Sequence, residues 1–258
     1  MRDEPDPGNG PAATPPYAWT PERMRASRPL PLPSRPPWPG RDGDRARLPA
    51  AALDLTAPPE RCRRAPEGAR VWTLLLPEQG PAEEAAGAAA LTAGERRAYA
   101  GLEPGPERRA WAVVRGGLRL LAAAHLGCSP DRITVLDGPC PLCARWHDGT
   151  AAGGDGGPLR LSWERCGGLV VYALSTTTVG VGVVRLPEDG DPAAVREAHR
   201  AARLAAGRRA LIRGGCAAGP GVTGDRSVER VAVPDGYGAA VVRHMSGAGA
   251  PGRSAGSL

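Results

Sequence analysis

The sequence predicts an α+β protein, because its helical and strand-like segments occur in separate runs. Two long segments carry helix signals: one runs from Pro106 to a Gly stop at Gly127, and the other opens at Asp191-Pro192. Three short apolar segments separated by tight turns follow one another over 159–184, as antiparallel strands do. Hydrophobic residues make up 41% of the chain, which is enough for a core, and since Phe is absent the core must be built from Val, Leu and Ala.

The two ends of the chain are predicted to be disordered tails. Residues 1–68 are dominated by Pro, Arg, Gly and Ala without a sustained period, and residues 247–258 are small and polar. We expect order to begin at Val71. The remainder divides in this prediction into an N-terminal lobe, 69–155, and a C-terminal lobe, 156–246.

The ordered part contains the following expected elements. A Thr92/Glu95 capping box starts one helix, and Leu118, Leu121 and Leu126 form the apolar side of the next. The predicted helices are therefore one that starts at 92, one over 106–126 and one over 191–213. The predicted strands cover 71–76, 133–136, 159–164, 169–175, 179–184, 228–233 and 238–243, with a Gly-rich loop over 138–157.

The charge balance suits an anionic partner. The chain has 33 basic residues, all of them Arg, a formal net charge of +6 and a pI near 9.4. A nucleotide, an acidic carrier protein or nucleic acid would fit this balance, and an Arg-rich tail that carries the excess is the alternative. No apolar run reaches the ~20 residues that span a bilayer, and no secretory signal is visible. We expect a cytoplasmic protein that is not membrane-bound, with reduced cysteines.

Motifs along 70–245 resemble those of a known family. They include Trp72 in the first strand, Leu91 to Arg96, the helix motif from Arg115 to Leu121, the segment 159–185 and the closing strand 233–242. Their order resembles the 4'-phosphopantetheinyl transferase superfamily in its monomeric, two-lobed form. The loop from Asp137 to His147 is similar to a Cys-Pro-x-Cys-x-x-x-His-Gly segment of many actinobacterial members.

The resemblance implies a pseudo-dimeric fold of two similar lobes and a cytoplasmic monomer of secondary metabolism. The family moves phosphopantetheine from coenzyme A to a Ser of an acyl- or peptidyl-carrier protein, and a Mg²⁺ ion clamps the diphosphate. Basic residues at the start of the second helix meet the coenzyme A 3'-phosphate in the family. Arg108 and Arg109 are the residues nearest to that position in this chain.

The chain departs from the family at its metal ligands. Gly182, Val184 and Arg209 stand where the family has its three acids, and Arg165 stands where it has a His. Arg can bind a phosphate but cannot exchange a proton near neutral pH. The resemblance therefore predicts a weakly active or inactive relative, with no metal ligands, whose arginines neutralise the phosphates of coenzyme A. The predicted cofactor-binding residues are Arg108, Arg109, Arg165, Arg208 and Arg213.

Three alternatives stay open. The first is an active transferase with displaced acids, for which the nearby acids are Glu164, Glu188, Asp189, Asp191 and Glu197. The second is a non-catalytic scaffold or a nucleic-acid-binding module, although no recognition motif supports nucleic acid. The third is a zinc site at Cys140, Cys143 and His147 that Cys166 or Cys128 would complete. Ser162, Ser175 and His125 form no nucleophile motif and are interpreted as structural.

Overall fold

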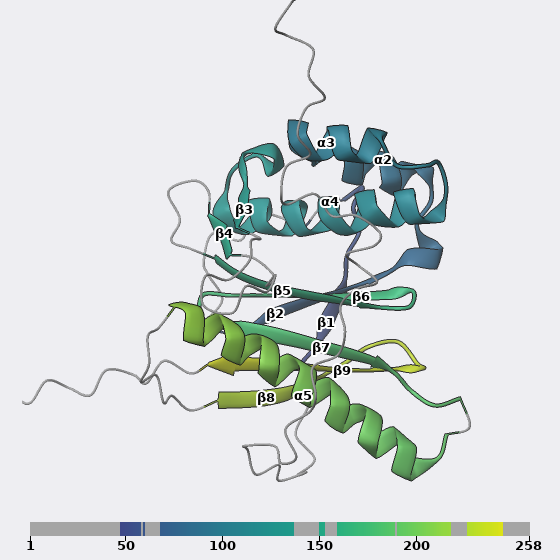
Figure 1. Ribbon diagram of the computed structural model, residues 1–258, viewed down its shortest axis with the longest axis vertical. Coiled ribbons are helices and arrows are strands. Elements are labelled where there is room, and N and C mark those ends of the chain that lie inside the picture. Colours follow the sequence, from purple (N-terminus) through teal and green to yellow (C-terminus); the bar gives the residue numbers. More distant parts are fainter. Residues whose placement is uncertain are drawn as a thin grey trace, which may run out of the picture. The chain divides into compact units, whose positions relative to one another are not determined.

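The computed structural model describes residues 47–57, 59, 68–136, 150–152, 159–188, 190–217 and 226–244, which all belong to one compact unit (Figure 1). Its helices are η1 (Leu76–Glu78), α2 (Pro81–Ala89), α3 (Ala93–Ala100), α4 (Pro106–Leu126), η2 (Pro130–Arg132) and α5 (Pro192–Ala217). Its strands are β1 (Ala50–Ala52), β2 (Arg70–Leu75), β3 (Thr134–Leu136), β4 (Thr150–Ala152), β5 (Leu159–Cys166), β6 (Leu169–Ser175), β7 (Val179–Arg185), β8 (Arg226–Val231) and β9 (Tyr237–His244). The α+β prediction is confirmed. None of the helices described is long and apolar enough to cross a membrane.

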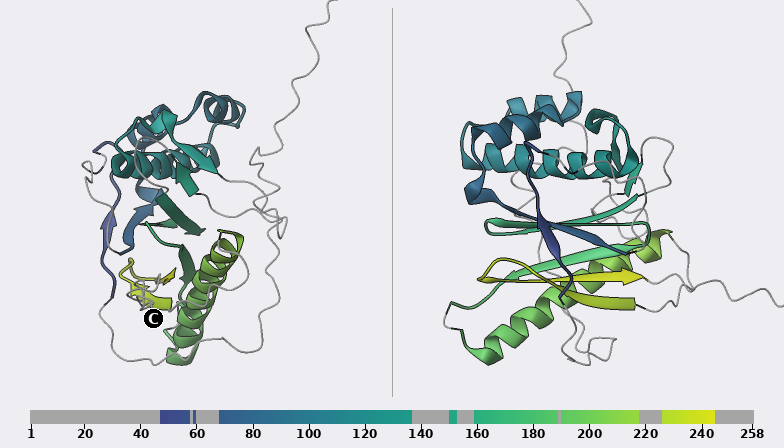
Figure 2. Two further views of the ribbon diagram at one scale, coloured as in Figure 1. Left: turned by 90° about the vertical axis from the view of Figure 1, so that its left-hand side faces the viewer. Right: turned by 180° about the vertical axis from the view of Figure 1, so that it is seen from behind.

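The described part is built in four layers, with two sheets between two layers of helices (Figures 1 and 2). One sheet has the strand order β1-β2-β6-β5-β4-β3, and the other has the order β7-β9-β8. One apolar cluster joins α4 to the first sheet, a second joins the two sheets, and a third joins β7 and β9 to α5. Every residue of β6 is buried, because α4 covers one face of this strand and the second sheet covers the other.

Three neighbouring strands of the first sheet, β2-β6-β5, have the same order as the three strands of the second sheet, β7-β9-β8. In the first, β2 pairs with β6 and β6 pairs with β5, and in the second, β7 pairs with β9 and β9 pairs with β8, all antiparallel. In chain order, the helices of each set follow its first strand: α2, α3 and α4 lie between β2 and β5, and α5 lies between β7 and β8. The strands over 159–175, which the sequence prediction assigns to the C-terminal lobe, thus lie in the sheet of the N-terminal strand β2. Their side chains Leu161, Tyr172 and Leu174 pack in the α4 cluster, which explains this placement.

Two side chains of β5 connect the sheets. Ser162 Oγ accepts a hydrogen bond from the Val181 backbone N–H at 2.9 Å, and Glu164 Oε2 accepts one from the Val183 N–H at 2.6 Å. β7 is an edge strand of the second sheet, so these N–H groups lack a strand partner on that side. The two polar side chains satisfy them, as buried donors require.

The helix ends follow the predicted signals. Thr92 and Glu95 form the capping box of α3, with the Glu95 N–H donating to Thr92 Oγ1 at 3.2 Å. α4 ends at Gly127, whose φ of 67° is left-handed and favours glycine. Asp191 caps α5 by accepting from the N–H groups of Ala193 and Ala194 at 3.1 Å.

The sequence signals do not predict α2, β1, β4, η1 or η2, and one expectation is wrong. β4 lies inside the segment 138–157 that was expected to be a loop. β1 lies inside the segment 1–68 that was expected to be disordered. β1 pairs parallel with β2, and the Leu53 and Leu55 side chains that follow it are buried in the α4 cluster. Order therefore begins before Val71, because this segment supplies two leucines that the core needs. Most of the predicted 138–157 loop and the tail 247–258 lie outside the described residues.

Candidate anion-binding cleft

A cleft of about 300 Å³ opens at the beginning of α4 and contains two of the predicted phosphate-binding arginines. We call it the α4 cleft. Its charged residues are Arg109, Arg165 and Glu107. The remaining lining residues are Leu76, Pro77, Gln79, Pro106, Ala110, Gly167 and Gly168.

Two turns place these side chains. Pro106 is the first residue of α4, so Glu107 and Arg109 lie in the first helical turn. Arg165 is the second-last residue of β5, directly before the Gly167-Gly168 turn, where Gly167 has a φ of 58°. The Leu76 N–H donates to the Gly168 carbonyl at 2.8 Å and holds this turn against the end of β2.

Arg165 is paired with Glu107 across the cleft. Its two terminal nitrogens lie 3.2 and 3.3 Å from the two carboxylate oxygens, and its Nε donates to the Gly167 carbonyl at 3.0 Å. The Arg165 side chain is 29% exposed, whereas that of Glu107 is 80% exposed. An exposed ion pair contributes little stability, so an anionic ligand can take the place of Glu107 at low cost. Glu107 was not predicted, because an acid in a first helical turn is typical of ordinary helices.

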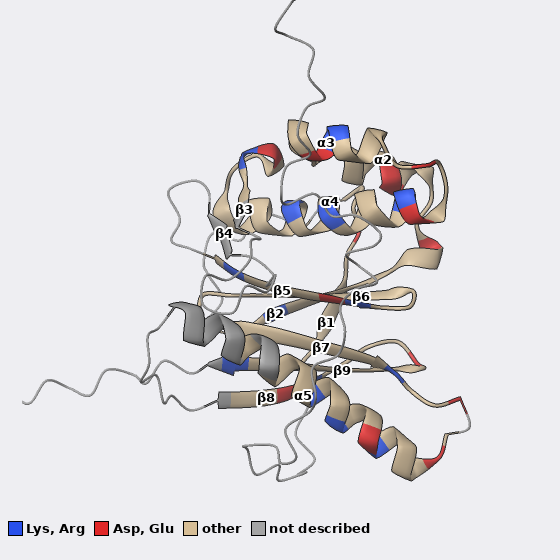
Figure 3. Ribbon diagram, in the orientation of Figure 1, with Lys and Arg blue, Asp and Glu red and all other residues tan. Residues whose placement is uncertain are grey.

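Arg109 and Arg108 are held by α2 and α3. Arg109 Nε lies 3.2 Å from Glu84 Oε2, and the Tyr99 hydroxyl donates to Glu84 Oε1 at 2.6 Å. The Tyr99 hydrogen bond holds the pKa of Glu84 below its ordinary value, with a smaller contribution from Arg109. Arg108 lies over the Tyr99 ring, 4.4 Å from its centre. Basic and acidic residues therefore lie side by side near the start of α4 (Figure 3). Of Arg108 and Arg109, only Arg109 lines the cleft.

Gly182 and Val184 of β7, which stand at acid positions of the family that the sequence resembles, face α5. A Cβ at Gly182 would lie 1.9 Å from the carbonyl oxygen of Ala202 and 2.7 Å from the backbone nitrogen of Ala206. Val184 packs against the apolar cluster that includes these two alanines. Neither position offers an oxygen ligand, so the residues present do not fit Mg²⁺. α5 contains Arg208, Arg209 and Arg213, whose side chains lie outside the part of the chain that the structure describes.

The acids considered for a displaced metal site have local roles in the described residues. Glu188 pairs with Arg185 at 3.2 Å, and Glu197 pairs with Arg200 at 3.5 Å. Asp191 caps α5, and Asp189 is not among the described residues. Glu164 differs from these acids because it reaches the backbone of β7.

The remaining candidates have no shared site that can be described. Cys140, Cys143 and His147 lie outside the described residues, while Cys128 and Cys166 are partly buried free thiols. Burial raises the pKa of Cys166, and the charge of Glu164 adds to this effect. Ser162 and Ser175 accept backbone hydrogen bonds, and burial lowers the pKa of His125, which packs edge-on against Trp72. These contacts agree with their structural interpretation.

The comparisons with known proteins add no assignment, since no protein-family model and no curated protein matches the chain.

Proposed function

We propose that this chain is a phosphopantetheinyl transferase-like protein that binds coenzyme A through its phosphate groups and has weak or no transferase activity. The observation that carries the proposal is the convergence of Arg109, from α4, and Arg165, from β5, on one cleft. The resemblance places Arg109 next to the family's position for binding the 3'-phosphate, and Arg165 stands at the family's His position, where a guanidinium can bind a phosphate.

The strand order supports two similar lobes. The sets β2-β6-β5 and β7-β9-β8 have the same pairing pattern, and each contains a helical insertion after its first strand. Two lobes drawn from this pattern divide after β6 rather than between residues 155 and 156. This division places the α4 cleft in the N-terminal lobe.

The charges of the cleft favour a phosphate over a carboxylate. The Arg165 guanidinium already binds two oxygens of Glu107 in a parallel arrangement. A phosphate monoester such as the 3'-phosphate of coenzyme A offers the same pair of oxygens with up to twice the negative charge, and guanidinium binds it in the same bidentate way. Arg109 adds a second positive charge to the cleft. We expect bound coenzyme A to displace the Glu107 side chain into solvent.

The residues at the family's metal positions support the loss of transfer. In the family the metal neutralises the diphosphate while a carrier-protein Ser attacks it. Gly182 and Val184 supply no oxygen ligand, and Arg165 cannot act as a proton carrier near neutral pH. We further propose a cytoplasmic, monomeric binding protein whose macromolecular partner is an acyl- or peptidyl-carrier protein, as the resemblance implies.

One observation favours a second candidate function, an active transferase with a displaced acid. The Glu164 carboxylate accepts a hydrogen bond from the Val183 N–H, between the two family acid positions on β7. A metal bound there would use Glu164 in place of the family's ligands. Dependence of coenzyme A binding on Mg²⁺ separates the two candidates.

The test of the proposal is calorimetric titration of the full chain with coenzyme A. Arg165→Gln should weaken binding by at least about tenfold, because a charged hydrogen-bonding partner is lost. Glu107→Gln should tighten binding, since the side chain that competes with the phosphate no longer carries a charge. Arg185→Gln and Glu188→Gln are matched controls from an exposed pair and should bind as the unaltered chain does. Equal affinity of Arg165→Gln and the unaltered chain would refute the proposal.

A further inference from the structure

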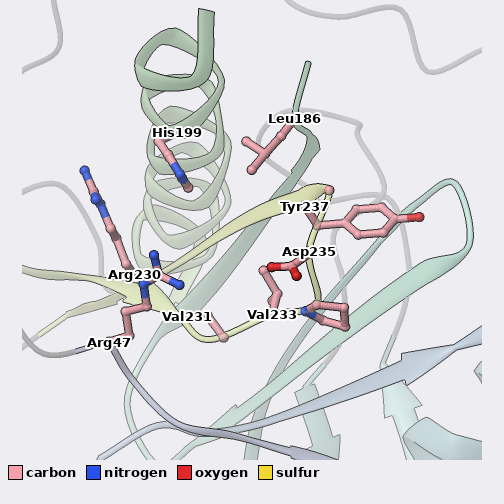
Figure 4. Close-up of a pocket in the computed structure, with 10 residues that line it drawn as sticks. Arg47, Leu186, His199, Arg230, Val231, Val233, Asp235 and Tyr237 are labelled. Carbon is pink, nitrogen blue, oxygen red and sulfur yellow. The ribbon is translucent and has the colours of Figure 1, made fainter. Parts of the chain in front are cut away.

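A second pocket, of about 110 Å³, lies beside Leu186, directly after the C-terminal end of β7. The proposed function does not explain this pocket. It is lined by the charged or ionisable residues Arg47, Arg230, His199 and Asp235, and by apolar and backbone groups from Leu186 and the β8–β9 turn. Figure 4 shows Arg47, Arg230 and His199 on one side of the pocket and Asp235 and Tyr237 on the other. We call it the Arg47 pocket.

Three segments distant in sequence build the cationic side. The Leu48 N–H donates to the Arg230 carbonyl at 2.7 Å, and the Ala232 N–H donates to the Leu48 carbonyl at 2.9 Å. These bonds fix the backbone next to Arg47 beside β8. His199 projects from α5, and its Nδ1 would lie 2.8 Å from a Cβ at Gly238, so only glycine at that position allows the ring this place. The site therefore depends on tertiary structure and has no sequence motif.

The charges on this side are not balanced by the described residues. The side chains of Arg47 and Arg230 are exposed and form no ion pair or hydrogen bond within the described part of the chain. Asp235 is the acid among the lining residues, and it lies on the opposite side. Both guanidinium groups lie close enough to His199 for their charges to act on it, and an anion bound beside His199 would offset both charges.

His199 completes the set as a neutral donor. Burial lowers its pKa, and the positive charges of Arg230, Arg47 and Arg203 lower it further. The ring is therefore neutral near pH 7, with one N–H available for a hydrogen bond. An anion between these groups would offset the arginine charges and raise the pKa of His199.

We propose that the Arg47 pocket binds a tetrahedral dianion, a phosphate or sulfate group, through Arg47 and Arg230 with His199 as an additional donor. The pocket, of about 110 Å³, is large enough for one such group. The proposal does not rest on coenzyme A binding. Tyr237 lies between the two sites, since it lines this pocket while its hydroxyl approaches Gly167 and Gly168 of the α4 cleft.

The test is titration of the full chain with sulfate, which keeps its double charge across the neutral pH range. Arg47→Gln and Arg230→Gln should each weaken sulfate binding by at least about tenfold. Asp235→Asn should tighten it, because a repelling charge is removed. Arg200→Gln removes one exposed charge from α5 outside the pocket and should leave the affinity unchanged. Equal losses in Arg200→Gln and Arg47→Gln, or no binding at all, would overturn the proposal.

The imidazole proton resonances give a second readout. Saturating sulfate should raise the pKa of His199, with the His199→Gln variant identifying the resonance, and an unchanged pKa would contradict the proposal. Arg165→Gln should not alter this shift, so a failure here is distinguishable from a failure of the coenzyme A proposal.

Inorganic phosphate and glycerol phosphate distinguish the source of the group. Equal affinities assign the pocket to a phosphoryl group of a larger molecule, and a preference for inorganic phosphate assigns it to the free ion.

Discussion

At Gly182 the backbone of β7 approaches the backbone of α5 so closely that no side chain fits. The neighbouring atoms are the Ala202 carbonyl oxygen and the Ala206 nitrogen, and neither can move without displacing the helix. Ala202 and Ala206 are fully buried, so the whole contact is made by small residues. The packing of α5 on β7 thus requires glycine at position 182.

Gly182→Ala should lower the free energy of unfolding by about 1–3 kcal/mol, because overfilling a packed site strains its neighbours. Urea denaturation measures this change. Gly94→Ala is the control: no atom lies within 4 Å of its Cβ position at the start of α3, so its stability should be unchanged or slightly higher. A Gly182→Ala variant as stable as Gly94→Ala would show that α5 does not pack as described.

The sequence pointed to some residues of the candidate site and not to others. The resemblance to a family pattern singled out Gly182, Val184, Arg109 and Arg165, and the roles proposed for these residues rest on that resemblance. The close contact at Gly182 was not predictable, because it depends on where α5 lies. Glu107 was not predictable either, because an acid in a first helical turn is common and its partner Arg165 is distant in sequence.

At the scale of elements, Glu95 connects α3 to α4. Its carboxylate accepts from the Thr92 N–H at 3.0 Å and forms ion pairs with Arg119 Nε at 2.5 Å and Arg115 Nε at 3.2 Å. Arg119 is buried and also donates to the carbonyls of Pro130 and Ile133. One carboxylate therefore accepts the hydrogen bond of a helix cap and forms ion pairs with two cations.

This arrangement predicts an acid-sensitive contribution to stability. Burial alone would raise the pKa of Glu95, but the Arg119 hydrogen bond, the Arg115 charge and the cap together hold it below its ordinary value of 4.5. A carboxyl with a lowered folded-state pKa stabilises the fold above its unfolded-state pKa, and this contribution is lost as pH falls through the folded-state pKa. The loss should therefore occur below about pH 4.5.

Glu95→Gln should lower stability at pH 7 by about 3 kcal/mol, because it leaves a buried arginine without its partner. Below pH 4.5 the variant and the unaltered chain should converge. Thermal unfolding at a series of pH values measures both effects. Glu188→Gln, at an 87% exposed side chain, is the control and should follow the unaltered chain. Parallel curves for Glu95→Gln and the unaltered chain at all pH values would contradict this account.

The predicted elements were those with strong local signals. The α3 capping box, the Pro106 start and Gly127 stop of α4, and the Asp191-Pro192 start of α5 all lie where the signals placed them. β1 was missed because it is three alanines long, and its stability comes from pairing with β2 and from the burial of Leu53 and Leu55. Local patterns cannot report such tertiary contributions.

At the scale of the whole described unit, the four layers make both proposed sites dependent on long-range contacts. The α4 cleft combines β5 with the start of α4, and the Arg47 pocket combines an N-terminal segment with α5 and β8. The sequence predicted the fold class. The sequence did not predict that β5 and β6 join the sheet of β2. This pairing depends on a tertiary contact, since apolar side chains of all three strands pack in one cluster with α4.

The N-terminal segment should contribute to global stability. A chain that begins at residue 59 lacks β1, Leu53 and Leu55, and should lose at least about 3 kcal/mol relative to a chain that begins at residue 47. The two leucines are 6% and 2% exposed, and the Leu53 N–H donates to the Thr73 carbonyl. Chemical denaturation of both chains measures the difference, and equal stability would mean that β1 is dispensable.

The central claim of the proposed function is that this chain binds coenzyme A without a metal. Its most direct test is calorimetric titration of the full chain with coenzyme A in the presence and absence of Mg²⁺. The account predicts binding of equal affinity in both conditions, because Gly182 and Val184 offer Mg²⁺ no ligand and the arginines of the α4 cleft remain charged. Binding that strengthens with Mg²⁺ would contradict the claim and favour a metal site at Glu164, and the absence of any binding would contradict the proposed function itself.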